Sequence, residues 1–168
     1  IVSPEWFKVS LDEVRKAHRD LSRRRKVSNN RERAKYVLAL KYERIDNRRL
    51  DWFFKLADVL TRKYPIICIE DLNIDAMKRL WGRKVSDLAF SEFVSILQWE
   101  ALKNNAQVIK VDRWEPTSKT CHRCGHVNND LSIEDRQWVC PHCHTALDRD
   151  VNAAINIRNI GVAQKQSA

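Results

Sequence analysis

Residues 121–154 read CHRCGHVNNDLSIEDRQWVCPHCHTALDRDVNAA, and this stretch decides how the last third of the chain folds. It contains two CxxC pairs, Cys121/Cys124 and Cys140/Cys143, with fifteen residues between them. Two residues between cysteines let a tight turn direct both thiolates at one ion, and four thiolates complete a tetrahedral site with no position open to water. The spacing predicts a structural zinc ribbon, in which Zn²⁺ supplies folding free energy to a segment too short for its own core.

The histidines of this stretch and the fifth cysteine of the chain, Cys68, receive simpler interpretations. His122, His126, His142 and His144 are interpreted as surface or supporting residues, although His126 or His144 could replace one cysteine ligand. Cys68 lies in an apolar run and is expected to behave as a small buried hydrophobe. Tightly paired cysteines without a visible signal peptide indicate a metal site in a reducing cytoplasm, so we expect a cytoplasmic, nucleoid-associated protein.

The chain of 168 residues carries a formal net charge of +9, which predicts a polyanionic partner. Basic residues crowd the stretch from Arg15 to Lys35, where Asp20 is the only acid between Arg19 and Arg31. A solvated helical face is the alternative interpretation of such a run. No apolar run approaches the ~20 residues of a membrane helix. We expect no membrane partner, and we assign nucleic-acid contacts to Arg19, Arg23, Arg24, Arg25, Lys26, Arg31, Lys78, Arg79, Arg83 and Lys84.

Apolar periodicity predicts an α/β order of elements. A helix capped by Ser10 breaks at 28–30, and a long amphipathic helix then runs to the residues before Pro65. The β-branched run 66–70 predicts a strand buried on both faces, followed by a loop over 71–85. A further helix ends at Asn104–Asn105, and a second strand covers 108–111. The last helix is expected to begin near Asn152, to stop at Gly161, and to be followed by a frayed tail from Gln164.

Several carboxylates follow strands or precede a helix in this order of elements. Glu70 ends the first strand and Asp112 follows the second, and ligands of open α/β sheets collect at such strand ends. Asp148 and Asp150 both stand before the last helix, where either could act as its cap. Converging carboxylates provide the hard oxygen ligands that Mg²⁺ prefers, and two such ions can assist phosphodiester hydrolysis.

Four motifs, in this order, resemble the C-terminal half of TnpB/OrfB-type transposon-encoded proteins. They are IICIEDLN, VDRWEPTSKTCHRCG, WVCPHC and LDRDVNAAINI. That family carries a RuvC-like nuclease domain of RNase H-like fold and resembles type V CRISPR effectors. The resemblance implies an RNA-guided, metal-dependent DNA endonuclease, with DNA and a guide RNA as partners. It places catalytic carboxylates on Glu70 and Asp150, an auxiliary or capping role on Asp148, and the Zn²⁺ ligands on Cys121, Cys124, Cys140 and Cys143.

The resemblance also implies a division of the chain around the inserted ribbon. The expected fold class is a partial RNase H-like (RuvC-like) α/β domain with a basic helical segment and an inserted four-cysteine zinc ribbon. The expected parts are a basic helical segment (1–65), the RuvC-like core (66–116), the zinc ribbon (117–147) and a C-terminal helix and tail (148–168). In such proteins the ribbon precedes the helix that bears the last catalytic aspartate.

One departure from the family pattern concerns catalysis. The family's first catalytic aspartate lies in a GIDxG-like motif on an early strand, and no such motif occurs here. The chain does not begin with methionine, and we expect it to be a piece of a longer protein. Three interpretations follow: an incomplete nuclease that uses Mg²⁺ when complete, a non-catalytic nucleic-acid-binding zinc-ribbon module, or a chain completed by a separate polypeptide. The sequence sets no oligomeric state. Asp112 is a candidate replacement for the first aspartate, although the family pattern gives it no such role, and Trp81 or Trp114 could stack on bases.

Overall fold

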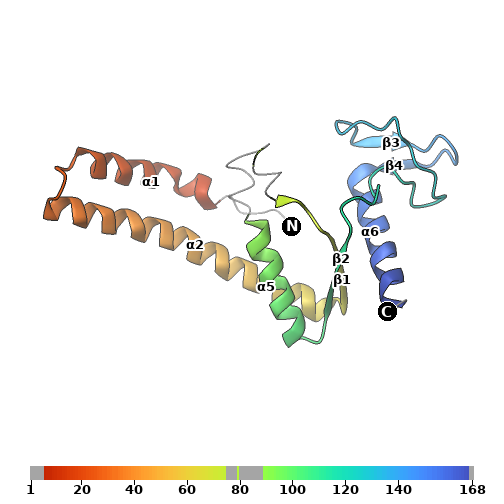
Figure 1. Cartoon of the computed structure of the whole chain (residues 1–168), viewed down its shortest axis with the longest axis horizontal. Helices are drawn as coiled ribbons and strands as arrows, with labels where there is room; N and C mark the ends of the chain where they lie inside the picture. Colours follow the sequence, from red (N-terminus) through yellow and green to blue (C-terminus); the bar gives the residue numbers. More distant parts are fainter. Residues whose placement is uncertain (1–5, 75–78, 80–88, 167–168) are drawn as a thin grey trace. The chain divides into compact units, whose positions relative to one another are not determined.

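The computed structural model describes residues 6–74, 79 and 89–166, with side chains from residue 10 onward. Lys78, Trp81, Arg83 and Lys84 lie outside these residues, and Arg79 is exposed. The chain divides into two compact units, residues 1–60 with 74–100 and residues 61–73 with 101–168. The elements are α1 (Trp6–Arg23), α2 (Asn29–Lys63), β1 (Ile66–Glu70), α5 (Phe90–Lys103), β2 (Gln107–Val111), β3 (Gln137–Val139), β4 (Ala146–Asp148) and α6 (Arg149–Gln166) (Figure 1).

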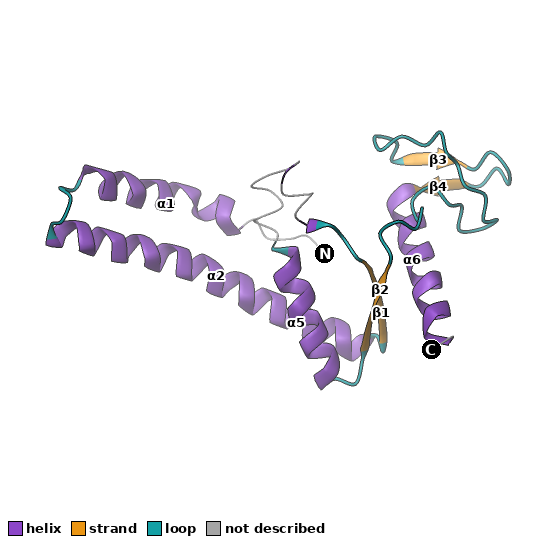
Figure 2. Cartoon of the chain, viewed as in Figure 1, coloured by secondary structure: helices purple, strands orange, loops and turns teal. Residues whose placement is uncertain are grey.

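Helices α1 and α2 form an antiparallel hairpin in the first unit, as Figures 1 and 2 show. Val14 and Ala17 of α1 pack against Leu38 and Ile45 of α2 in a buried cluster. The predicted break is confirmed, because the Ser28 hydroxyl accepts a hydrogen bond from the Arg31 amide at 3.2 Å and caps α2. The predicted cap at Ser10 is wrong: α1 begins at Trp6, so Ser10 lies inside the helix.

Aromatic side chains join the later part of α2 to α5 within the same unit. The rings of Phe53 and Phe93 lie 5.3 Å apart, and Phe54 meets Trp99 edge to face at 5.9 Å. Arg49 adds an ion pair to Glu92 at 3.3 Å. Helix α5 ends as predicted, since Asn105 adopts a left-handed conformation with φ of 54°.

The second unit contains a parallel pair of strands, β1 and β2, with α6 packed alongside them (Figure 1). In the register of β1 against β2, Cys68 lies opposite Ile109 and Glu70 lies opposite Val111. The prediction that the first strand is buried on both faces is wrong, because all five of its residues are only half-buried. Among the described residues, β1 pairs with β2 alone, which leaves its other edge without a partner strand.

Helix α6 corrects two further expectations. It begins at Arg149 rather than near Asn152, and it runs through Gly161 to Gln166 instead of stopping at the glycine. Gly161 is buried where α6 crosses the sheet, and a Cβ placed there would lie 2.5 Å from the Cys68 Sγ and 3.5 Å from Ile109. The glycine therefore serves close helix–strand packing and not helix termination. A search of the described residues finds no helix that is long and apolar enough to cross a membrane.

Replacing Gly161 by alanine tests this packing. Alanine is favoured over glycine inside a helix by about 1 kcal/mol, but the collision with Cys68 is expected to reverse the sign and destabilise the protein by about 1–3 kcal/mol. The free energy of unfolding is measured by urea denaturation for Gly161→Ala, Cys68→Ala and the double variant. Removing the Cys68 sulfur should recover part of the loss. A Gly161→Ala protein more stable than the wild type would contradict the close contact.

Candidate metal centre and carboxylate cavity

Four cysteine sulfurs converge in the second unit. The Sγ atoms of Cys121 and Cys143 lie 3.7 Å apart, those of Cys124 and Cys140 lie 3.6 Å apart, and all four lie within 4.8 Å of one another. Ligands about 2.3 Å from one tetrahedral ion are about 3.8 Å apart, whereas a disulfide joins its sulfurs at about 2.05 Å. The sulfurs therefore fit one four-coordinate metal ion. The cluster found among the described residues includes no histidine.

Each CxxC pair occupies a turn with the same hydrogen-bond pattern. The amide of Cys121 donates to the His126 carbonyl at 2.8 Å, and that of Cys140 donates to Thr145 at 2.9 Å. In both turns the fifth residue donates back to the first cysteine at 2.9 Å. Those fifth residues, Gly125 and His144, have φ of 76° and 55°, so both turns require the left-handed conformation. Two equivalent turns thus present two sulfurs each.

The electrostatics of the sulfurs favour a bound cation. Hydrogen bonds from the Thr145 hydroxyl and amide lower the pKa of Cys143 to about 6, which favours its thiolate. The His126 amide acts the same way on Cys124, but burial and the three neighbouring sulfurs raise the pKa of Cys124 to about 12. Four thiolates so close together repel one another unless a metal ion neutralises them.

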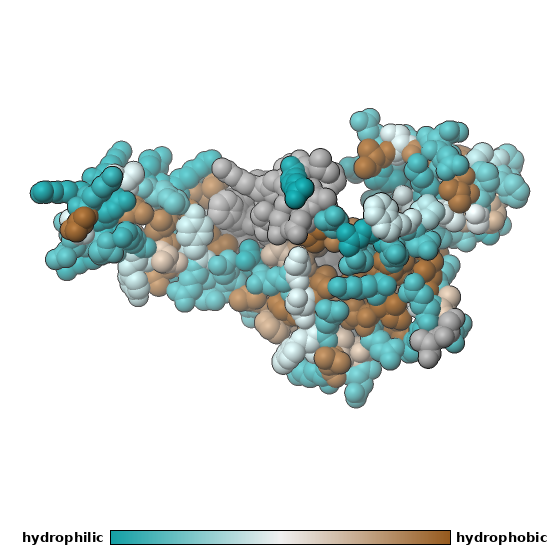
Figure 3. Space-filling view, in the orientation of Figure 1, coloured by the Kyte–Doolittle hydropathy of each residue, from teal (hydrophilic) through white to brown (hydrophobic). Residues whose placement is uncertain are grey.

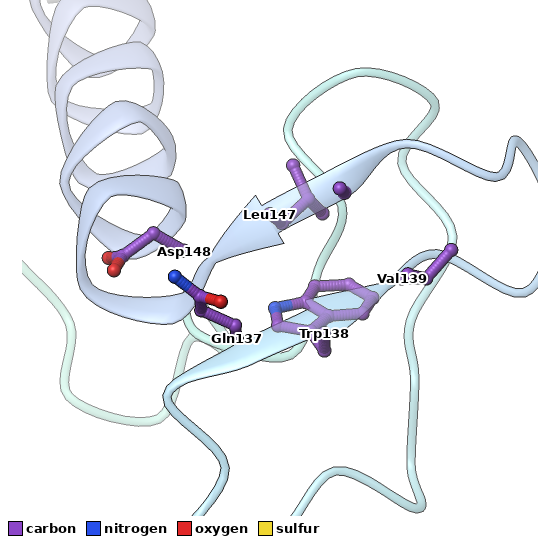
Figure 4. Close-up of a pocket in the computed structure, with 6 residues that line it drawn as sticks. Gln137, Trp138, Val139, Leu147 and Asp148 are labelled. Atoms are coloured by element: carbon purple, nitrogen blue, oxygen red, sulfur yellow. The ribbon is translucent and has the colours of Figure 1, made fainter.

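A small apolar cluster supports the metal site from one side. Trp138 of β3 pairs with Leu147 of β4, and both pack with Leu131, Cys121 and Cys140. Figure 4 shows Trp138 and Leu147 on the neighbouring strands, with Asp148 where β4 passes into α6. These strands line a pocket of about 330 Å³. The hairpin was not predicted from the sequence, since strands of three residues carry little periodic signal.

Asn152 connects α6 to the turn that carries Cys121 and Cys124; we call the two CxxC turns the metal turns. Its side chain is only 1% exposed, and its amide nitrogen donates to the carbonyls of Thr117, Ser118 and Thr120 at 3.3, 3.3 and 2.8 Å. Its amide oxygen accepts the backbone N–H of His122 at 3.0 Å. One buried side chain therefore fixes the segment that enters the first cysteine turn.

Asn156 repeats this contact one turn further along α6. It is 8% exposed, and its amide nitrogen donates to the carbonyls of Thr117 and Thr120 at 2.8 and 2.6 Å. We call Asn152 and Asn156 the amide clamp. Sequence reasoning missed it, although two asparagines four residues apart in a helix are a signal, because buried amides must find partners.

Asp148 and Asp150 take different roles at the start of α6. The Asp148 Oδ1 accepts the amides of Asp150 and Val151, both at 3.0 Å, so Asp148 is the cap of the helix. Asp150 keeps a side chain that is 88% exposed, with Arg149 Nε 3.6 Å from its Oδ1. Capping by one aspartate leaves the other free to bind a ligand.

Glu70 and Asp150 line the same cavity, of about 550 Å³, in the second unit. The positively charged side chains of Arg113, Lys119 and Arg149 line it as well, together with a third carboxylate, that of Glu115. The structure thus brings together the two carboxylates that the sequence singled out. Asp112 is not among the lining residues, and its Oδ1 instead accepts the Trp114 amide at 3.0 Å.

Two arginines of the cavity are held by neighbouring groups. Arg149, whose side chain is 21% exposed, donates to the Ile133 carbonyl as well as approaching Asp150. Arg113 donates to Asp71, and this hydrogen bond is the main reason that the pKa of Asp71 lies below its usual value. Neither arginine was predicted as a site residue, because each is positioned by contacts between distant parts of the sequence.

The predicted nucleic-acid contacts fall into two groups. Arg19, Arg23, Arg24, Arg25 and Lys26 are exposed on the end of α1 and the turn after it. Arg31 differs, since its Nη1 donates to the Leu21 carbonyl at 2.9 Å and to that of Arg24 at 3.4 Å. Arg31 therefore fastens the end of α1 to α2.

Comparisons with known proteins identify the relatives of this chain. The family described as "Probable transposase" matches residues 1–80, and the family described as "Cas12f1-like, TNB domain" matches residues 90–157. A "Putative RNA-guided DNA endonuclease" of Streptomyces pristinaespiralis is 36% identical over 97% of this chain and 41% of its own length. A TnpB-like protein of Acanthamoeba polyphaga mimivirus is 30% identical over 94% of this chain and 31% of its own length.

Solved structures of Cas12f share the fold. A Cas12f1–sgRNA–target DNA complex matches with a TM-score of 0.57 and 22% identity over 89% of this chain and 42% of that one. A CRISPR-Cas12f ternary complex matches with a TM-score of 0.58 and 23% identity over 90% and 32%. The fold is thus a mixed helix–strand fold resembling Cas12f1, and the class is that of transposase-associated proteins. The chain belongs to the TnpB/OrfB family, and it spans less than half the length of these relatives.

The amide clamp predicts how strongly each of two substitutions at Asn152 lowers the stability of the second unit. Asn152→Ala should destabilise the second unit by about 1–3 kcal/mol, because it leaves buried carbonyls unpaired. Asn152→Asp should cost more, because it turns a carboxylate oxygen toward three carbonyl oxygens. Thermal unfolding with bound metal measures both. Asn159→Ala, on an exposed part of α6, is the matched control and should change little. Equal stability of the aspartate variant and the wild type would contradict the clamp.

Proposed function

We propose that this chain is the carboxylate- and zinc-bearing part of an RNA-guided, Mg²⁺-dependent DNA endonuclease with a RuvC-like domain of RNase H-like fold. The observation that carries the proposal is the cavity shared by Glu70 and Asp150 and lined by three cations. Membership of the TnpB/OrfB family supports it, since named relatives are described as RNA-guided DNA endonucleases. DNA is the proposed substrate, and a guide RNA is the proposed partner.

The donor set of the cavity suits Mg²⁺. Carboxylate oxygens are its preferred protein ligands, and the remaining volume accommodates the waters and phosphate oxygens that this ion retains. Glu70 and Asp150 are the residues that would hold it. When bound, Mg²⁺ supplies Lewis-acid stabilisation of negative charge on the phosphodiester.

The cationic side chains of the cavity bind and orient the DNA backbone. Lys119 and Arg149 provide N–H donors that suit phosphate oxygens. The hydrogen bond from Arg149 to the Ile133 carbonyl fixes the guanidinium between the ribbon and Asp150. Asp148 keeps the start of α6 in place, so that Asp150 need not serve as the cap. Lys119 and Arg149 hold the DNA backbone, and the phosphate to be cleaved lies between these two cations and the carboxylates of Glu70 and Asp150.

The open edge of β1 supports the RNase H-like part of the proposal. A parallel sheet is normally covered on both faces and extends beyond two strands, yet β1 is half-buried and pairs with β2 alone among the described residues. A strand that bears the family's first aspartate would pair with this edge. It would bring a further carboxylate close to Glu70, at the carboxyl end of β1. The proposed parts are a basic helical segment (1–65), a RuvC-like core (66–116), a zinc ribbon (117–147) and a terminal helix (148–168).

The proposed identity of the metal at the four cysteines predicts a stoichiometry. The purified chain should contain about one Zn²⁺ ion, measured by elemental mass spectrometry. Cys140→Ser should lose most of this zinc and unfold the ribbon, reported by increased amide hydrogen exchange in residues 121–148. Cys68→Ser, which alters the one cysteine outside the cluster, should keep it. Full zinc content in Cys140→Ser would contradict four-thiolate binding.

The catalytic proposal is tested on the chain extended through the coding sequence upstream of Ile1, with guide RNA, target DNA and Mg²⁺. Glu70→Gln and Asp150→Asn should each reduce DNA cleavage more than about 100-fold, because each removes a metal ligand. Both variants should still bind nucleic acid. Asp112→Asn is the matched carboxylate control and should cleave normally. Cleavage that survives both substitutions would refute the assignment, and binding without any cleavage by the unsubstituted protein would favour the non-catalytic module.

A further inference from the structure

We propose that one flank of the α1–α2 hairpin is a binding track for the sugar–phosphate backbone of a nucleic acid. Its cations are Arg33, Lys41, Arg44 and Arg48 of α2, which we call the cationic stripe. Lys41, Arg44 and Arg48 lie beyond the basic stretch from Arg15 to Lys35 that the sequence singled out, and Arg33 falls within it. The inference rests on the proposed function only in taking a nucleic acid as the partner.

Helical spacing places the stripe on one face of α2. The intervals between its members are eight, three and four residues, and Val37 fills the longest interval, so successive side chains lie one above the other. At a rise of 1.5 Å per residue, the stripe from Arg33 to Arg48 extends about 22 Å along the helix. That length matches several consecutive phosphates of one strand.

Two surface cavities mark the groove between α1 and this flank of α2. One, of about 170 Å³, is lined by Ser10, Glu13, Val14, Lys41, Arg44, Ile45 and Arg48. The other, of about 270 Å³, is lined by Ala17, Asp20, Arg24, Asn30, Arg33, Ala34 and Val37. The Ser10 hydroxyl adds a hydrogen-bond donor beside three cations. The face of the hairpin visible in Figure 3 is likewise mostly hydrophilic.

Charge is distributed unequally between the two flanks of the hairpin. On the other flank the cations are matched locally, since Lys35 pairs with Glu32 at 2.7 Å and Arg49 with Asp46 at 2.8 Å. On the stripe flank, five cations and two carboxylates line the cavities. Lys41 bonds to one of these carboxylates, Glu13, at 2.6 Å.

The carboxylate of Glu13 lies within the field of three members of the stripe. Its hydrogen bond to Lys41, followed by the charges of Lys41, Arg44 and Arg48, holds the pKa of Glu13 below its usual value. Among the described residues, Arg44 and Arg48 form no ion pair of their own within 4 Å. The flank thus retains excess positive charge that an external polyanion can neutralise.

The chemistry of this flank favours the phosphate backbone over the bases. No aromatic side chain lines either cavity, so base stacking has no platform there. Arginine and lysine contacts to phosphates position a nucleic acid without reading its sequence, and a basic stripe along a helix is the usual footprint of such binding.

The test compares two variants that each remove two positive charges. Arg44→Gln/Arg48→Gln removes half of the stripe, and Arg15→Gln/Lys35→Gln removes two cations from the other flank. Fluorescence anisotropy measures binding of the full chain to single-stranded RNA, hairpin RNA, single-stranded DNA and duplex DNA over a range of salt concentrations. Circular dichroism confirms that the helices persist in both variants.

The stripe variant should bind at least about 10-fold more weakly than the control, and its slope of log K against log salt should fall by about 1.5–2. Arg44→Lys/Arg48→Lys should retain binding, and Glu13→Gln should strengthen it, because it removes an opposing charge. A loss confined to the RNA ligands, to the DNA ligands, or common to both identifies which backbone occupies the track.

Equal loss in the stripe variant and the control would overturn the proposal, because net charge alone would then explain binding. Unchanged binding in the stripe variant would overturn it as well. The outcome is separable from that of the proposed function, since Glu70 and Asp150 belong to the other compact unit. Loss of DNA cleavage in the Glu70 and Asp150 variants does not alter the prediction for the stripe. Unchanged nucleic-acid binding in the stripe variant likewise does not alter the prediction for cleavage.

Discussion

The amide clamp formed by Asn152 and Asn156 is the contact on which the carboxylate cavity depends. It fastens α6 to the backbone carbonyls of Thr117 and Thr120, immediately before Cys121, the first cysteine of the four-sulfur cluster. Asp150 stands two residues before Asn152, so its position follows from the clamp. A buried amide is costly without partners, and the observed register of α6 against this segment provides them. The metal turns and the carboxylate are therefore set by the same few hydrogen bonds.

Two independent contacts orient α6, one at each end. Near its start the clamp binds the ribbon, and near its end Gly161 allows close approach to Cys68 of β1. Because β1 also carries Glu70, packing along α6 controls how Glu70 and Asp150 are placed in the lining of one cavity. This accounts for a metal site placed directly before an aspartate. A segment with so small an apolar core would become rigid on binding a metal at its four cysteines, and the clamp would transmit that rigidity to α6.

Local chemistry explains which features the sequence predicted. The CxxC spacing, the Ser28 break and the alternative capping role of Asp148 each depend on residues within one or two turns, and each is confirmed as geometry. Contacts between distant segments were missed. Gly161 was read as a stop signal because its partner, Cys68, is about ninety residues away. Arg149 and Asn152 gained their roles from carbonyls that no sequence pattern marks, and the open edge of β1 reduced a burial that its β-branched run had predicted.

Hydrogen–deuterium exchange of the full chain, with zinc bound and after its removal, tests the central claim most directly. If the clamp couples the metal turns to α6, removing zinc should raise exchange in residues 117–122 and in the first two turns of α6 together. The α1–α2 hairpin, which belongs to the other unit, should remain unchanged and serves as the internal reference. Loss of protection in the cysteine turns while residues 149–156 keep theirs would contradict the account, because Asp150 would then be positioned without the ribbon.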